Sequence, residues 1–143
     1  MKKLIALAAI AAMAAGALAG EHNTPETSGD YAKLTAGEAV YAGNIAGVWT
    51  NGLAYAVNSA TPATGTLTVC GVFQYSAAQG ESVLVKRGGF LLENVGNITK
   101  KEIGSLAYSI TTNAWTVSKT NANKQVGKVA DVRDDGVVVI IGR

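Results

Sequence analysis

The stretch that decides the fold is Gln125–Ile141, which reads QVGKVADVRDDGVVVII. Two runs rich in Val and Ile flank Asp134-Asp135-Gly136, and an Asp-Gly pair accepts the positive φ angles of a tight hairpin turn. We therefore expect antiparallel strands at 125–133 and 137–141. The second run has five consecutive apolar residues, which favours a strand buried on both faces.

Toward the N-terminus, similar short runs alternate with turns that contain Gly or Asn. The predicted strands are 38–42, 45–49, 53–57, 66–75, 82–87, 90–92, 106–110 and 114–118. This spacing is typical of a β-sandwich or barrel. The one helical signal lies at 98–104, where Thr99 and Glu102 have the spacing of a capping box. The expected fold is all-β: a small antiparallel barrel or sandwich with one short helical turn.

The N-terminal segment, residues 1–19, differs from the rest. Lys2 and Lys3 precede an apolar run, and Ala17 and Ala19 fit the small-residue pattern of a processing site before Gly20. One interpretation is a signal peptide that is removed. The other is an Ala-rich apolar helix that stays attached, since Ala has the highest helix propensity.

The following residues, 20–37, are rich in Gly, Pro, Ser, Thr and Asn, and we interpret them as an extended arm or linker. The expected organisation is thus an apolar segment at 1–19, an arm at 20–37 and one β domain at 38–143. A chain of 143 residues suits a single domain. Its 48% hydrophobic content is enough to bury a core.

The charges are balanced in number and uneven in position. Without Lys2 and Lys3 the chain has ten basic and ten acidic residues. It therefore lacks the excess of positive charge that binding to nucleic-acid phosphates needs. Residues 21–85 carry one Lys against five acidic residues, and residues 86–143 carry nine basic against five acidic residues. The two halves could pair between neighbouring copies, or both sets could simply be solvated.

The residue types that carry catalysis or bind metals are scarce. One His and one Cys cannot form a zinc site, and His22 lies in the arm, away from any plausible Ser-His-Asp arrangement. Cys70 lies in an apolar run and is interpreted as a small core residue. We expect no enzyme, no metal and no cofactor. A weaker hypothesis is a sugar-binding module in which Trp49 and Trp115 stack on a ligand, although such residues more often pack in a core.

Candidate contact residues come from the arm and from two basic pairs. In the arm they are Glu26, Asp30 and Tyr31, which could reach a neighbouring subunit. The basic pairs are Lys86-Arg87 and Lys100-Lys101. Each pair is either a solvated face or a contact with an acidic neighbouring surface.

The order of elements from Val40 to Arg143 resembles the head decoration, or capsid cement, proteins of tailed bacteriophages. The pieces that carry the resemblance are YAG at 41–43, NGLAYAV at 51–57, VCGV at 69–72, VLVKRGGF at 83–90, the segment 98–108, and GKVADV and DGVVV within 127–139. It covers about 70% of the chain. Each piece alone is common, and their order and spacing together carry the specificity. Residues 1–37 depart from what the family leads us to expect.

This resemblance implies an all-β protein on the outside of a virion. Such a protein would bind the major capsid protein and other copies of itself as a dimer or trimer, and would help the shell to resist internal DNA pressure. It would contact neither nucleic acid nor, in its mature form, a membrane. The alternative is an exported, self-associating β protein of a bacterial surface or filament, which residues 1–19 favour.

Overall fold

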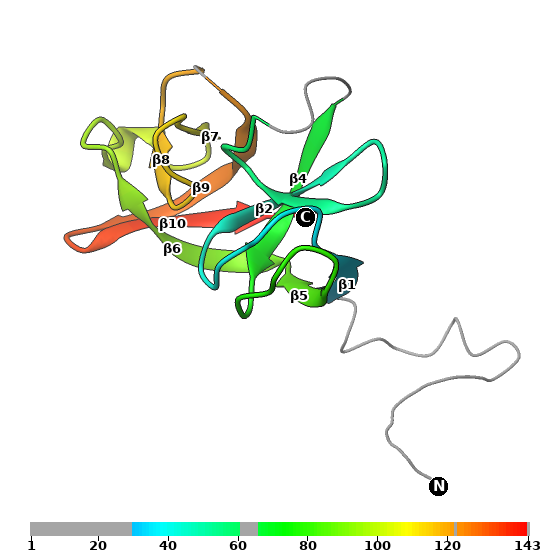
Figure 1. The fold of residues 1–143 in the computed structure, drawn as a ribbon. Coiled ribbons are helices and arrows are strands. Elements are labelled where there is room, and N and C mark those ends of the chain that lie inside the picture. The colour runs from blue at the N-terminus through cyan, green and yellow to red at the C-terminus, as the bar shows by residue number, and fades with distance from the viewer. Residues whose placement is uncertain (1–29, 61–65, 122, 143) are drawn as a thin grey trace, which may run out of the picture.

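A computed structural model describes residues 30–60, 66–121 and 123–142, and this part of the chain is almost entirely β-structure. The strands are β1 (Tyr31–Thr35), β2 (Ile45–Trp49), β3 (Ala54–Ala56), β4 (Leu67–Phe73), β5 (Ser82–Lys86), β6 (Gly88–Asn94), β7 (Leu106–Ser109), β8 (Thr116–Ser118), β9 (Gln125–Arg133) and β10 (Gly136–Ile141). They form two units, and the chain passes from the first to the second between β5 and β6 (Figure 1). The predicted all-β class is confirmed.

The first unit is a five-stranded antiparallel sheet in the order β1-β5-β4-β2-β3. The sheet curls so far that Ala36, just after β1, forms a parallel bridge to Ala54 at the start of β3. The Gly37 N–H also donates a hydrogen bond to the Ala54 carbonyl (2.8 Å). The two edges of the sheet therefore meet at one end.

The second unit is a closed five-stranded barrel in the order β10-β6-β8-β7-β9. Its pairs are antiparallel except for β6 and β8, which run parallel over Glu93 and Asn94. The β9–β10 hairpin forms around Asp134-Asp135 as the sequence predicts, with Gly136 opposite Arg133. Along β10, Val137, Val139 and Ile141 are fully buried, whereas Val138 and Ile140 are half-buried. The predicted burial on both faces is thus complete on one face only.

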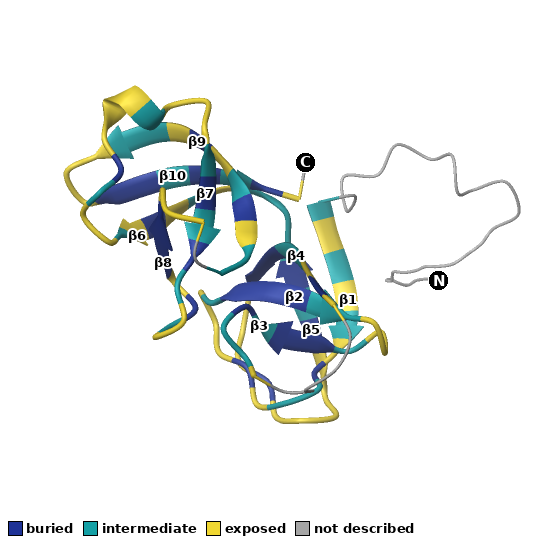
Figure 2. Ribbon diagram, turned by 90° about the horizontal axis from the view of Figure 1, so that it is seen from above, coloured by how far each residue is buried: buried dark blue, intermediate teal, exposed yellow. Residues whose placement is uncertain are grey.

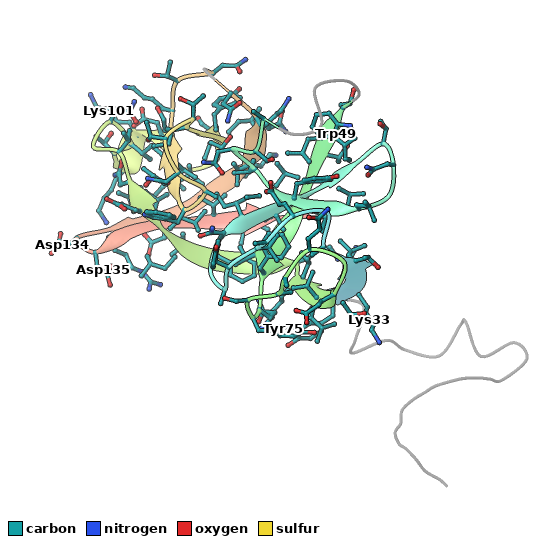
Figure 3. The ribbon with its side chains drawn as sticks, viewed as in Figure 1. Lys33, Trp49, Tyr75, Lys101, Asp134 and Asp135 are labelled. Atoms are coloured by element: carbon teal, nitrogen blue, oxygen red, sulfur yellow. The ribbon has the colours of Figure 1, made fainter. Side chains whose placement is uncertain are left out.

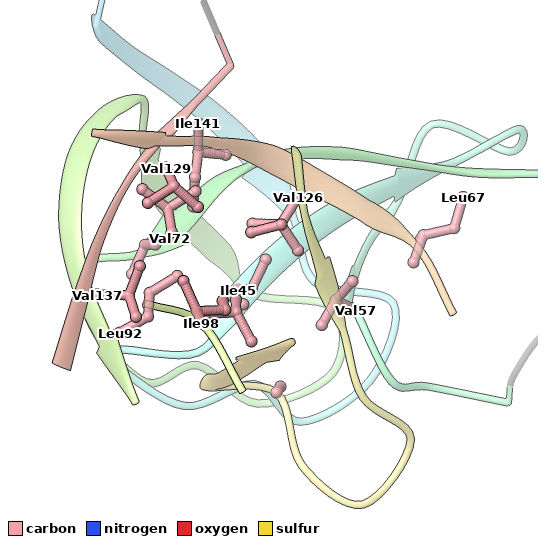
Figure 4. Packing of buried hydrophobic residues seen from close by; sticks show 14 of the residues in the cluster. Ile45, Val57, Leu67, Val72, Leu92, Ile98, Val126, Val129, Val137 and Ile141 are labelled. Carbon is pink, nitrogen blue, oxygen red and sulfur yellow. The ribbon is translucent and has the colours of Figure 1, made fainter. Parts of the chain in front are cut away.

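Strand alternation gives the first sheet two apolar faces. Ala46 and Phe73 belong to a cluster inside the curl, whereas Ile45 and Val72, their neighbours in the chain, belong to the larger cluster shared with the barrel. Figure 4 shows this shared core, in which Ile45 and Val72 pack among barrel residues such as Val137. The Ile45 N–H also donates to the Ala114 carbonyl (2.6 Å). The burial pattern of Figure 2 agrees, with buried strands where the two units meet.

Three predictions differ from the structure. Residues 38–42 form no strand, because only Val40 makes an isolated bridge, to Ala77. The helical signal yields a single 3-10 turn, Lys100–Glu102, although its capping box is present. Part of the predicted arm is strand β1, which pairs with β5 along its whole length. The β domain therefore includes Tyr31–Thr35, and the boundary at residue 38 was placed too late.

The N-terminal apolar helix, the processing site at Ala17, Ala19 and Gly20, and most of the arm lie outside the described residues. Within the described part of the chain, no helix has the length and apolar character needed to cross a membrane.

Candidate interaction surfaces

Four of the predicted contact residues come together at the edge of the first sheet. Tyr31 pairs with Lys86 across β1 and β5. The Lys86 ammonium lies 5.7 Å from the centre of the Tyr31 ring, within the range of a cation–π contact. The Arg87 N–H donates to the Asp30 carbonyl (2.6 Å). Asp30, Tyr31, Lys86 and Arg87 thus form one surface, which we call the β1 edge.

The other basic pair lies elsewhere. Lys100 and Lys101 are exposed on the 3-10 turn of the barrel, and Figure 3 shows Lys101 far from Lys33 of β1. Their charges act on carboxylates of the same chain. Lys101 contributes to lowering the Glu102 pKa, although the main causes are hydrogen bonds from Thr99. Glu26, the remaining predicted contact, lies outside the described residues.

The predicted charge asymmetry largely disappears once the units are known. Residues 30–87 hold three acidic and three basic residues, because Lys86 and Arg87 belong to the first unit. The acidic excess of the first half resides instead in Glu21 and Glu26 of the arm. Pairing between oppositely charged units is therefore not supported by the described residues.

The sequence analysis missed an apolar patch on the outer face of the barrel. Leu91, Val95 and Trp115 are 47%, 49% and 46% exposed. Leu91 and Val95 lie two residues before and after Glu93, whose carboxylate accepts a hydrogen bond from the Trp115 indole N–H (2.9 Å). The Glu93 N–H donates to the Trp115 carbonyl and the Val95 N–H to the Val117 carbonyl, so the backbone holds these residues side by side. We call Leu91, Val95 and Trp115 the barrel patch.

A sequence signal for this patch exists in the alternation of β6. Leu91 and Glu93 occupy alternate positions of β6 and therefore point to the same side of the strand, and Val95 continues this spacing one residue past its end. Their link to Trp115 could not be predicted, because it depends on the parallel pairing of β6 with β8.

A second exposed aromatic pair lies at the end of the first unit. Tyr41 and Tyr75 are 60% and 43% exposed. The Ala42 N–H donates to the Ser76 hydroxyl (3.1 Å), which brings the two loops that carry these tyrosines together. Tyrosine is enriched at protein interfaces, because its ring is apolar and its hydroxyl tolerates water.

Two observations on the described residues concern metal binding and the single thiol. Those residues contain no group of three or more His, Cys, Asp or Glu residues that could hold a metal ion. Burial raises the Cys70 pKa to about 11, against a smaller opposing effect of Arg87, so the thiol is protonated at neutral pH. A protonated thiol is a poor nucleophile.

Comparison with protein-family models, with curated proteins and with solved structures finds no match.

Proposed function

We propose that this protein decorates the outside of an assembled phage head and stabilises the shell by bridging major capsid subunits. The observation that carries the proposal is the ordered series of motifs from Val40 to Arg143 that resembles the capsid cement proteins. Most of these motifs lie on strands or at strand ends: 83–90 spans the junction of β5 and β6, and 127–139 contains the β9–β10 hairpin.

The surfaces support a protein that acts by contact. The barrel patch and the tyrosine pair expose apolar and aromatic side chains, and clustered exposure of this kind is typical of interaction sites. A shell presents the same surface many times. Weak contacts made by a dimer or trimer of this chain therefore add up through avidity, without any single strong site.

We place the shell contact on the barrel patch. Trp115 is its largest member, and its indole is held in place by Glu93. Aromatic residues of this kind commonly contribute most of the binding energy of an interface. Replacement Trp115→Ala should therefore lower the affinity for shells about tenfold or more, since a central aromatic residue contributes about 2 kcal/mol.

The experiment is cosedimentation of the purified protein with assembled shells and, separately, with unassembled major capsid subunits. We expect binding to shells, little binding to free subunits, and a loss of binding for Trp115→Ala. The matched control is Ile103→Ala, which removes an equally exposed apolar residue outside the patch. Equal binding to shells and free subunits, or no binding to either, would overturn the proposal.

The second candidate is an exported β protein that self-associates on a bacterial surface or in a filament. The edge position of β1 favours it, because an edge strand offers backbone groups for pairing with another chain. This candidate requires a mature chain that begins at Gly20 and assembles without capsid protein. Intact mass of the protein from its native source, near 14.6 kDa for the whole chain, distinguishes the two.

A further inference from the structure

A groove of about 710 Å³ lies between the two units, and its volume falls in the range of about 300–1,000 Å³ that is common for small-molecule sites. One wall is the first half of β4. The opposite wall belongs to the barrel and combines residues of β7, β9 and β10. The two units touch where a Cβ at Gly142 would lie 3.0 Å from the Cys70 carbonyl oxygen, and this contact fixes the spacing of the walls at that point.

Five of the residues that line the groove are aliphatic. They are Leu67 and Val69 on the β4 wall, and Leu106, Val126 and Ile140 on the barrel wall. Leu67 and Val126 are buried, whereas the other three are half-buried and keep apolar surface in contact with water. A hydrocarbon chain in the groove would remove that surface from water, which is favourable in proportion to the area covered.

A lysine stands among these aliphatic side chains on the barrel wall. Lys128 of β9 is paired with Leu106 of β7 on one side and with Ile140 of β10 on the other. Directly paired residues point to the same face of a sheet, so the three side chains form one row. Lys128 is exposed, whereas Val129, the next residue, is buried in the barrel core. The row therefore lies on the outer face of the barrel, where it lines the groove.

A second lysine, Lys124, lies just before β9 and also lines the groove. Its N–H donates to the Ser109 hydroxyl (3.1 Å), and its carbonyl accepts from the Ser109 N–H (2.8 Å). Ser109 is fully buried. These two hydrogen bonds hold the backbone of Lys124 against the barrel, beside the groove.

The positive charge of the groove is not balanced within the described part of the chain. The described residues that line the groove include two lysines and neither Asp nor Glu. Among the described residues, the ion pair that is present joins Arg133 to Asp131 and involves neither lysine. A concave surface lined by one sign of charge attracts ligands of the opposite sign. Charge complementarity therefore favours an anion, and the aliphatic walls favour an anion with an apolar body.

We propose that this groove binds a single-chain amphiphilic anion, namely a fatty acid. Its carboxylate lies beside Lys124 and Lys128, and its hydrocarbon chain packs against the aliphatic residues of both walls. The ligand thereby contacts the first sheet and the barrel at once. This inference is independent of the proposed capsid function, because it involves no contact with a shell.

The test is titration of the full-length ¹⁵N-enriched protein with decanoate at pH 7, below the concentration at which decanoate forms micelles. We expect the backbone amide signals of Val69, Leu106 and Lys128 to shift in NMR spectra and to saturate. The signals of Lys100 and Lys101 should stay in place. For a ligand of this size we expect a dissociation constant on the order of 100 µM. No saturable shift at the groove would overturn the proposal.

Two further probes separate the charge from the chain. Acetate has the carboxylate without the chain, and decyltrimethylammonium has a chain of the same length with the opposite charge. Neither should produce saturable shifts at the groove. Equal binding of decyltrimethylammonium would overturn the assignment to an anion. Decanoate shifts that are largest at the barrel patch would also overturn the proposal, because they would show general adsorption to exposed apolar surface.

A bilayer presents the same chemistry in another form, since its anionic lipids also combine a charge with hydrocarbon chains. We expect the protein not to sediment with vesicles of phosphatidylglycerol, because the groove takes up a free, single-chain ligand. Sedimentation with these vesicles would overturn the assignment to a free fatty acid.

Variants of the groove test the lysines directly. The double variant Lys124→Glu, Lys128→Glu should weaken decanoate binding about tenfold, because it replaces attraction by repulsion. The matched control is Lys100→Glu, Lys101→Glu, which makes the same change of charge outside the groove and should leave the affinity unchanged. Equal effects of the two double variants would overturn the role of the groove lysines.

Thr68→Glu guards against misfolding of the double variant. Thr68 is an exposed residue of the β4 wall, so its replacement leaves the core intact. The new carboxylate would lie in the groove and compete with the ligand for the lysines. We expect weaker decanoate binding, and an unchanged affinity in this variant would contradict the proposed site.

Discussion

At the residue scale, Gly136 shows how closely the barrel strands approach. Its φ is +153°, which side chains of L-residues rarely adopt, and a Cβ there would collide with the Leu92 carbonyl oxygen. Gly136→Ala should therefore destabilise the protein by about 1–3 kcal/mol. Urea unfolding followed by circular dichroism measures the change.

The matched control for Gly136 is Gly43→Ala. Gly43 also has a positive φ, of +88°, but a Cβ there would meet nothing within 4 Å. Its cost should be limited to the backbone conformation, about 1 kcal/mol. Equal destabilisation by the two variants would mean that the contact with Leu92 contributes nothing.

Cys70 should make stability depend on alkaline pH. Burial raises its pKa in the folded state to about 11, from a reference value of 9.0. Between these values the unfolded chain ionises while the folded chain does not. The contribution of the neutral thiol is therefore complete below pH 9 and is lost as the pH rises toward 11, by on the order of 2 kcal/mol.

The measurement for Cys70 is the free energy of unfolding at pH 8 and pH 10.5, in the wild type and in Cys70→Ala. The loss over this interval should be smaller in Cys70→Ala, because the other titrating groups are unchanged. An identical loss in both proteins would show that Cys70 is not the cause. Sequence analysis placed Cys70 among apolar residues, and the structure places it half-buried beside Arg87.

At the element scale, local signals were predictable and long-range partners were not. The capping box needs only Thr99 and Glu102, and the structure contains it, with the Thr99 N–H donating to Glu102 (2.7 Å). The β9–β10 hairpin likewise depends on neighbouring residues. β1 could not be predicted, because it lies in residues 20–37, whose composition is typical of a linker, and its partner β5 lies about 50 residues later in the chain.

The membership of β1 in the folded domain can be tested at Leu34. This side chain packs against the cluster inside the curled first sheet, whereas Lys33 beside it is exposed. Leu34→Ala should cost about 1–3 kcal/mol, at or below the range for fully buried leucines because Leu34 is only partly buried. Lys33→Ala is the control and should be nearly neutral. If both variants unfolded like the wild type, β1 would behave as a linker.

At the scale of the whole molecule, the candidate surfaces were predictable only in part. Each residue of the β1 edge was identified from the sequence: Asp30, Tyr31, Lys86 and Arg87. That they lie together depends on the register between β1 and β5. The barrel patch was missed for a related reason. Trp115 lies 24 residues after Leu91 in the chain, and only the parallel pairing of β6 with β8, which begins just after Trp115, brings the two segments side by side.

The shared core has a consequence for how the molecule unfolds. Ile45 and Val72 of the first sheet pack in the same cluster as Val137 of the barrel. Neither unit can therefore lose its structure without exposing apolar surface of the other. We expect one cooperative transition, as is usual for a domain of this size.

The chain has one tryptophan in each unit, which allows a direct test of this cooperativity. Trp49 packs edge-to-face with Tyr55 at 6.1 Å in the first sheet, and Trp115 lies on the barrel. Trp115→Phe leaves a reporter of the first sheet, and Trp49→Phe leaves a reporter of the barrel. In each single-tryptophan protein, the transition seen by fluorescence should coincide with the global transition seen by circular dichroism.

Ile45→Ala, added to each single-tryptophan protein, tests whether destabilising the first sheet also destabilises the barrel. Ile45 is fully buried in the shared cluster, so its truncation should cost about 2–5 kcal/mol. In a single cooperative unit, the unfolding midpoint seen by each tryptophan should move to a lower denaturant concentration by the same amount. This holds although only one tryptophan lies in the sheet that was changed. A shift seen by Trp49 and not by Trp115 would mean that the barrel folds without the first sheet.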